Sequence, residues 1–287
     1  MSETQSNPKA SRRSGRKERM ALRAAKPQVH PCPPGQLGGA YKPLTEGDLQ
    51  SIFETALRLL EELGMGEVPD NIAQALMASG AIDNGKGRFL LPRALVQDAI
   101  DQASKVFTLH GRDAHRSIIV GGEAVHFGTG GAAVQTLDMD NGLYRPSTLT
   151  DLHDFTRLQD TLENVSWFTR CCVATDVPDN FDLDVNTVYA LLANTTKPVA
   201  TSFTLAEHVD PIVEMLDIVS GGPGKFAERP FVKAHISPVI SPMRFGEDAV
   251  DVVFECVEHR IPISNITAAQ AGATAPATMA GFLAQSL

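Results

Sequence analysis

The chain has 287 residues, of which 43% are hydrophobic and 21% are charged, and its net charge is −9 at pH 7. The length fits one large domain or two small ones, and the composition excludes collagen-like, coiled-coil and wholly disordered proteins. No apolar run approaches the ~18 residues that a membrane span needs, so we expect a soluble protein.

The first 30 residues are basic. Eight Lys and Arg oppose Glu3 and Glu18, so the rest of the chain carries a net charge of −15. A charge run without an apolar core is typical of a solvated tail and excludes a secretory signal peptide. A nucleic-acid arm and an organelle-targeting segment are the alternatives. The acidic body argues against nucleic acid as the main partner, and we expect residues 1–43 to be a basic disordered tail followed by a Pro/Gly linker.

The four cysteines have no spacing that predicts disulfides or a CxxC motif; they are Cys32, Cys171, Cys172 and Cys256. Adjacent cysteines such as Cys171 and Cys172 rarely pair with each other. We therefore expect reduced thiols in a cytoplasmic protein.

Residues 44–105 are predicted to form a small helical region before the main domain. A helix begins after Thr45, where Thr45 and Asp48 resemble a capping box, and apolar residues repeat at helical spacing until Leu63, before Gly64. Two further helices are expected, over 69–80 and 93–103.

The pattern changes to short strands after residue 105. Three strands are expected, over 106–109, 117–120 and 124–127, the last ending at the glycine-rich segment 128–131. A hairpin is expected to follow, with strands over 133–137 and 143–145 and with Asn141-Gly142 at its turn.

From Thr148 onward, amphipathic helices alternate with apolar strands in a repeat of a little over thirty residues. The expected helices cover 148–162, 182–195, 206–219 and 245–259, and the expected strands cover 165–175, 198–204, 230–237 and 262–267. This alternation indicates a parallel sheet covered by helices, either an open doubly wound sheet or a (β/α)8 barrel. Segment 128–131 leads into a hairpin and not into a helix, so it fails as a dinucleotide-binding fingerprint, and the barrel is favoured.

The fold class predicted for residues 106–287 is therefore an α/β TIM-type (β/α)8 barrel that is incomplete. About five strands are expected, whereas the fold needs eight and takes around 250 residues. The helical pattern of residues 280–287 continues to the last residue without a cap. We expect a barrel truncated at its C-terminus, the front part of a larger protein.

Chemistry on such a barrel is expected at the carboxyl ends of its strands. The segments there are 126–130, 170–173, 202–204, 235–239 and 265–267, rich in small, hydroxyl and imidazole side chains and poor in carboxylates. Because Mg²⁺ sites need several carboxylates, this composition argues against Mg²⁺-dependent enzymes. Lys233 is the one internal candidate for a Schiff base, although a lysine that reaches solvent is the simpler interpretation.

No metal site is predicted. Five residues would supply enough zinc ligands, but their spacing is not that of a zinc motif; they are His126, Cys171, Cys172, His235 and His259. The two histidines at strand ends, His126 and His235, are expected to serve as hydrogen-bonding or acid–base groups, with a structural role as the alternative.

The glycines and nearby aromatic residues each allow more than one interpretation. Segment 128–131 either permits a tight bend or leaves space for a phosphate or a bulky cofactor. Three aromatic residues either form a cage for a quaternary ammonium group or pack in the core; they are Phe127, Trp167 and Phe203.

Several motifs occur in the order found in one enzyme family. They are Leu57-Arg58-Leu59-Leu60-Glu61-Glu62-Leu63-Gly64, Phe107-Thr108-Leu109-His110-Gly111-Arg112-Asp113, His126-Phe127-Gly128-Thr129-Gly130-Gly131, Asn194-Thr195-Thr196-Lys197-Pro198 and the glycine-rich segment 271–281. On these motifs, residues 43–287 resemble the trimethylamine methyltransferase family.

The resemblance implies an enzyme that moves a methyl group from trimethylamine, glycine betaine or a similar quaternary amine to the Co(I) of a corrinoid. It also implies that the corrinoid (cobalamin) is carried by a separate partner protein, with no cofactor bound tightly to this chain. Such a displacement needs orientation and exclusion of water, which agrees with strand ends that are poor in carboxylates. Founding methanogen members carry pyrrolysine in later strands, beyond the residues present here.

The candidate site combines strand-end position with this resemblance. His235 is the catalytic candidate, and the corrinoid-contacting candidates are Gly128, Thr129 and Gly130. The substrate-binding candidates are Phe127, Arg170, Phe203, Thr204, Ser237 and Thr267. Arg170 is the nearest cation for the carboxylate of a betaine.

Two other functions stay open. A non-catalytic truncated barrel would bind methylated amines or the corrinoid partner without turnover, because an incomplete barrel leaves strand edges open. A carbon–carbon lyase would use Lys233 as a Schiff base. The sequence leaves the oligomeric state undetermined, a homo-oligomer included.

Overall fold

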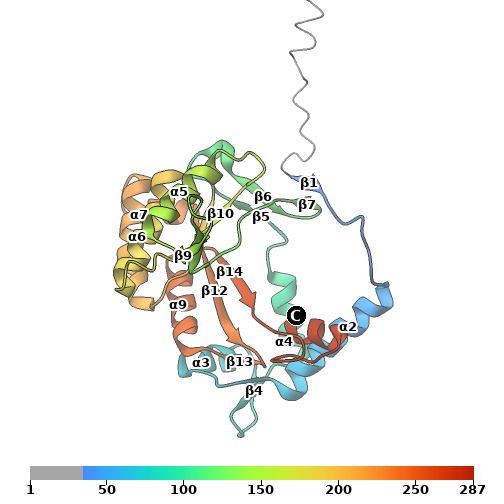
Figure 1. Ribbon diagram of the computed structural model, residues 1–287. Helices are drawn as coiled ribbons and strands as arrows, with labels where there is room; N and C mark the ends of the chain where they lie inside the picture. The colour runs from blue at the N-terminus through green and yellow to red at the C-terminus, as the bar shows by residue number, and fades with distance from the viewer. Residues whose placement is uncertain (1–34) are drawn as a thin grey trace, which may run out of the picture. The chain divides into compact units, whose positions relative to one another are not determined.

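The computed structural model describes residues 35–287, which lie within one compact unit (Figure 1). The predicted basic tail lies outside the described residues. The predicted linker contains a short strand, β1 (Gln36–Leu37), which pairs with β7 (Ala124–Val125). None of the helices in the described part of the chain is long and apolar enough to cross a membrane.

The α-helices are α2 (Glu46–Arg58), α3 (Asp70–Ala78), α4 (Arg93–Gln102), α5 (Leu149–Asp160), α6 (Asn180–Asn194), α7 (Val209–Ser220), α8 (Lys225–Glu228), α9 (Glu247–Glu258) and α10 (Met279–Ser286). Short 3₁₀ turns are η2 (Ala114–Arg116) and η3 (Ala206–His208). The remaining strands are β2 (Met65–Gly66), β3 (Ile82–Asp83), β4 (Arg88–Leu90), β5 (Val106–Leu109), β6 (Ile118–Gly121), β8 (Gln135–Leu137), β9 (Tyr144–Pro146), β10 (Phe168–Thr169), β11 (Val199–Thr201), β12 (Val232–Ile240), β13 (Arg244–Phe245) and β14 (Ile263–Thr267).

The first helix begins at its predicted cap. Thr45 and Asp48 form a capping box, in which the Asp48 N–H donates to Thr45 Oγ1 over 3.2 Å. The helical run ends before Gly64 as predicted, although α2 itself stops at Arg58 and a π-helical turn, η1 (Leu59–Leu63), completes the run. The Gly64 N–H donates to the Leu59 carbonyl five residues back, and Gly64 then leaves the helix at a φ of 69°.

The region 44–105 contains strands as well as the predicted helices. β4 pairs antiparallel with both β2 and β3, and β2 pairs in parallel with β13. The three predicted helices are present, and these short strands, which were not predicted, lie between them. The strands β2, β3 and β4 are only two or three residues long, too short to show an alternating pattern in the sequence.

The predicted parallel sheet is present. β10, β11, β12 and β14 pair in parallel in that order. Segment 128–133 adds a fifth parallel segment through the bridges Gly128–Trp167 and Ala133–Cys172. The described residues thus form a mixed α/β fold with an open parallel sheet, and they close no barrel. The strand expected over 165–175 is shorter than predicted. It consists of β10, with bridge residues at Trp167 before it and at Cys172 after it.

Helices α5, α6, α7 and α9 lie along one side of this sheet (Figure 1). Their apolar faces and alternate strand residues form the core. The side chains that are almost fully buried in it include Leu152, Phe168, Val188, Leu191, Val199, Ile212, Leu216, Phe226, Val232 and Val252. The alternation of buried and half-buried residues along β12 shows that only one of its faces contacts the helices.

An ion pair joins β9 to the start of α5. Arg145 donates two hydrogen bonds of 2.7 Å to the two carboxylate oxygens of Asp151. The Thr148 N–H, at the cap of α5, donates to the same carboxylate over 2.8 Å. These hydrogen bonds, above all those from Arg145, lower the pKa of Asp151 from 3.8 to about 2.

We expect this ion pair to make the stability depend on pH. Because the pKa of Asp151 is lower in the folded protein, its stabilisation is complete above about pH 4 and is lost as the pH falls toward 2. A shift of this size corresponds to about 2 kcal/mol. Asp151→Asn should therefore lose less stability than the wild type between pH 5 and pH 2.5 in urea unfolding. Identical pH profiles of the two proteins would contradict this expectation.

Candidate functional site

The polar residues of β12 lie on the side of the sheet away from the helices. Lys233, His235 and Ser237 are half-buried and alternate along β12 with residues buried in the core. Neighbouring strands add residues in register: Ala200 pairs with Lys233, Thr169 with Ala200, and Ser264 with His235. Paired residues point to the same side of a sheet. We call this surface the inner face; its residues are Thr169, Ala200, Lys233, His235 and Ser264.

A cavity of about 430 Å³ lies between the inner face and the hairpin of β5 and β6. Its lining is mainly apolar, and it includes Phe107, Leu109, Ile118 and Val120 from the hairpin. Trp167, Lys233 and Ser264 line it from the sheet, near the amino ends of the strands. This volume is in the range of small-molecule sites.

The ammonium group of Lys233 lies 4.2 Å from the centre of the Trp167 ring, which is a cation–π contact. Burial lowers the pKa of Lys233. Lys233 thus lines a cavity beneath an aromatic ring, rather than extending freely into solvent as the simpler interpretation held. Burial and, to a lesser extent, the charge of Lys233 lower the pKa of His235, so His235 is neutral at pH 7.

The glycine-rich segment forms the edge of the sheet. Thr129 Oγ1 donates to the Thr169 carbonyl over 2.7 Å and accepts from the Thr169 N–H over 2.9 Å. A Cβ atom at Gly128 would lie 2.0 Å from Cε2 of Trp167, whereas one at Gly130 would have no heavy atom within 4 Å. The expectation that this segment follows the end of a strand is therefore wrong, because it runs alongside β10 as a strand segment itself.

Hydroxyl groups connect the strands near their carboxyl ends. Ser202 Oγ donates to the His235 carbonyl, and Ser237 Oγ donates to the Ile266 carbonyl, each over 2.9 Å. Thr267 is exposed and pairs with Val239 after a bulge in the β12–β14 register. His235, Ser237 and Thr267 thus lie on adjacent strands, and the Ser237 hydroxyl already serves to hold two of those strands together.

A buried carboxylate anchors the loop between β11 and α7. Asp184 of α6 is 1% exposed and accepts hydrogen bonds from the Thr204 N–H at 2.6 Å, from Thr204 Oγ1 at 2.9 Å and from His208 Nδ1 at 2.8 Å. The candidate Thr204 is therefore tied to Asp184. Neither Asp184 nor His208 was among the residues expected to be functional. The signal was available, because Asp184, Val188 and Leu191 follow helical spacing along one buried face.

The other three candidates occupy different environments. Arg170 is half-buried; burial lowers its pKa, and the nearby carboxylate of Asp184 opposes that effect. Phe127 is 57% exposed. Phe203 is buried in the core, where its ring packs among apolar side chains. The structure thus places Arg170 and Thr204 around Asp184, His235 on the inner face, and Phe203 in the core.

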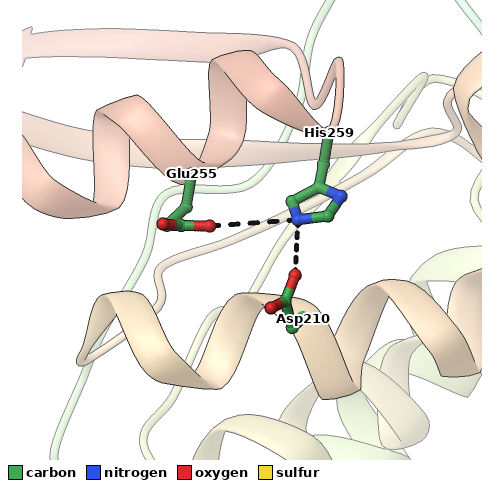
Figure 2. A group of neighbouring side chains, drawn as sticks. All are labelled: Asp210, Glu255 and His259. Carbon is green, nitrogen blue, oxygen red and sulfur yellow. Dashed lines mark ion pairs between the residues drawn. The ribbon is translucent and has the colours of Figure 1, made fainter.

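The residues that were considered as zinc ligands do not come together as a set. In the part of the chain that the structure describes, the one group of three suitable ligands is Asp210, Glu255 and His259, on the outer helices α7 and α9 (Figure 2). His259 Nε2 lies 2.6 Å from Asp210 Oδ1 and 3.9 Å from Glu255 Oε2. These are ion pairs at the surface. The described cysteines Cys171, Cys172 and Cys256 are free, whereas Cys32 lies outside the described residues.

Comparison with known proteins gives a consistent result. "Trimethylamine methyltransferase MttB" of Desulfitobacterium hafniense (strain DSM 10664 / DCB-2) is 27% identical over 240 residues, which are 83% of this chain and 48% of the relative. "Glycine betaine methyltransferase" of Desulfitobacterium hafniense (strain Y51) is 27% identical over 250 residues, 87% of this chain and 51% of the relative. "Trimethylamine methyltransferase MttB" of Methanosarcina barkeri is 26% identical over 251 residues, 83% of this chain and 49% of the relative.

The chain spans about half the length of these curated relatives. The family described as trimethylamine methyltransferase (MTTB) matches residues 11–287. Because this match covers nearly the whole sequence, the chain belongs to the trimethylamine methyltransferase family.

Proposed function

We propose that this chain forms part of a (β/α)8-barrel methyltransferase, which moves a methyl group from a methylated amine to a corrinoid carried by a partner protein. The family match over residues 11–287 is the observation that carries the proposal. The parallel strands with helices on one face support the proposal, because they would supply five of the eight strand positions of such a barrel.

In this reaction the main task of the protein would be to orient the substrate. The Co(I) of the corrinoid would supply the nucleophile, and the nitrogen of a quaternary or protonated amine becomes neutral when its methyl group is displaced. Residues of the barrel need to hold the amine in line and exclude water. The inner face carries hydroxyl and imidazole groups together with Lys233, and it has no Asp or Glu among its residues.

His235 is the residue that we place closest to the substrate. It lies on the inner face, and its lowered pKa keeps the imidazole neutral at pH 7, so it does not repel a cationic amine. Ser202 holds the backbone of His235 through its carbonyl. Thr204, Ser237, Thr267 and Arg170 would surround the mouth at the carboxyl ends, whereas the buried Phe203 is left out of this set.

The glycine-rich edge is the proposed approach for the corrinoid. At Gly130, the position of a Cβ atom is open space, which leaves room for a large planar ring. Thr129 fixes this edge to β10 through its two hydrogen bonds to Thr169. Phe127, which is exposed beside these residues, is the proposed aromatic neighbour of the substrate.

Methyl transfer can be measured directly. We expect the protein, mixed with cob(I)alamin and a panel of methylated amines, to form methylcobalamin, which is followed by its absorbance. His235→Ala should lower the rate by about tenfold or more, because the substrate loses an orienting contact. Ser220→Ala, at the end of an outer helix, is the matched control. Absence of methylcobalamin with every amine tested would refute the proposed function, and an unchanged rate in His235→Ala would reduce His235 to a structural role.

A further inference from the structure

We propose that Asp210, Glu255 and His259 bind a Zn²⁺ ion, which would join the outer helices α7 and α9. They are the one group of three neighbouring metal-ligating side chains in the part of the chain that the structure describes. The inference does not rest on the proposed function, because these residues lie in the outer helix layer and not on the inner face of the sheet.

The two helices hold the three side chains on a fixed backbone. Asp210 is in the first turn of α7, beside the fully buried Val209. Glu255 and His259 are four residues apart at the end of α9, with the fully buried Cys256 between them. Residues four apart lie on the same face of a helix. Because Val209 and Cys256 belong to one hydrophobic core, packing sets the separation of the two helices and of the ligands that project from them.

The ligand atoms are already close to the separations of a zinc site. Nε2 of His259 lies 2.6 Å from Asp210 Oδ1 and 3.9 Å from Glu255 Oε2 (Figure 2). One ligand atom from each residue lies within 4.8 Å of the others. Ligands at about 2.1 Å from a tetrahedral Zn²⁺ are about 3.4 Å apart. Each of the two contacts of His259 therefore needs to change by less than about 1 Å, which rotation of the two acidic side chains can supply.

The three side chains are available to a metal ion. Within residues 35–287, they form ion pairs with one another and no other side-chain hydrogen bond or ion pair. Two carboxylates face a single imidazole, so a divalent cation would neutralise more negative charge than the histidine does. Zn²⁺ would bind the lone pair of Nε2 while the ring keeps its proton on Nδ1. The imidazole ligand favours Zn²⁺ over Mg²⁺ and Ca²⁺, which prefer oxygen ligands.

Zinc that binds this site only in the folded protein should raise the Tm. For untagged protein stripped of metal with EDTA, we expect a rise of about 5–10 °C when zinc is at about 100 times its dissociation constant. Co²⁺, used as a spectroscopic substitute, should give the intense visible absorption of a four-coordinate ion, and Mg²⁺ should give no effect. His259→Gln and Asp210→Asn should each lose most of the rise in Tm and weaken Co²⁺ binding at least about tenfold.

His115→Gln is the matched control. Nδ1 of His115 forms a similar ion pair with Asp113 Oδ1 over 2.7 Å, but no third ligand completes that pair among the described residues. This variant should respond to zinc and Co²⁺ as the wild type does. An equal metal response in the wild type and both site variants, or no rise in Tm and no Co²⁺ absorption in the wild type, would overturn the inference. If one site variant does not fold, the wild-type Co²⁺ spectrum and the other variant decide.

Discussion

Replacing Asp184 with Ala is expected to lower the free energy of unfolding by about 3–5 kcal/mol, because several buried hydrogen-bond donors lose their acceptor at a cost of about 1–3 kcal/mol each. Asp184 is 1% exposed, and its carboxylate accepts three hydrogen bonds from Thr204 and His208. Without it, the Thr204 N–H and the His208 ring are left without a partner in a site from which water is excluded. A buried donor without an acceptor has lost its hydrogen bonds to water and has no hydrogen bond within the protein to replace them.

Urea unfolding followed by Trp167 fluorescence measures this loss. Asp182→Ala is the matched control, because Asp182 lies in the first turn of the same helix but is exposed. Its loss should cost less than about 1 kcal/mol, through the helix dipole alone. Asp184→Asn keeps the shape and one of the two acceptor oxygens, and its loss of stability should fall between those of the two Ala variants. Equal losses in the Ala variants of Asp184 and Asp182 would show that the buried network contributes no net stability.

Gly128→Val is expected to lower the free energy of unfolding by about 1–3 kcal/mol, the usual cost of forcing extra atoms into a packed site. The first added carbon would lie 2.0 Å from the Trp167 ring, so the ring must move. Trp167 would then leave the ammonium of Lys233, which removes the cation–π contact on the inner face. We therefore expect a shift in tryptophan emission together with the loss of stability.

Gly130→Val is the control on the same edge of the sheet. Its side chain would enter open space, since no heavy atom lies within 4 Å of the Cβ position, so stability and emission should stay close to the wild type. Gly130 also lies on the proposed approach for the corrinoid. Gly130→Val should therefore slow methyl transfer without destabilising the protein. Wild-type emission and stability in Gly128→Val would contradict the close packing of Gly128 on Trp167.

The parts of the fold that depend on local patterns could be predicted from the sequence. The helix cap at Thr45 follows from the residue types of one turn, and the alternation of helices and strands after residue 148 follows from side-chain periodicity within each segment. Strands β2, β3 and β4 could not be predicted in this way. They contain two or three residues each, and their pairing partners come from segments far along the chain.

The candidate site was predicted less completely than the fold. Strand-end reasoning led to His235 and Ser237, because the order of the strands alone indicates which residues follow them. It misplaced the glycines at 128–131, since a glycine that permits close packing on a ring looks the same in sequence as a glycine at a turn. It also gave no weight to Asp184 and His208, which meet only when α6 packs beside the loop after β11.

The sequence by itself determined the order of elements, the parallel α/β architecture and the resemblance to methyltransferases, because these depend on composition, periodicity and motif order. Only the tertiary structure decided which side chains meet. Lys233 and Trp167 are 66 positions apart, and their contact depends on the register of three neighbouring strands and on which face each residue occupies. Register and strand order are set by packing between distant segments, and no local pattern in the chain records them.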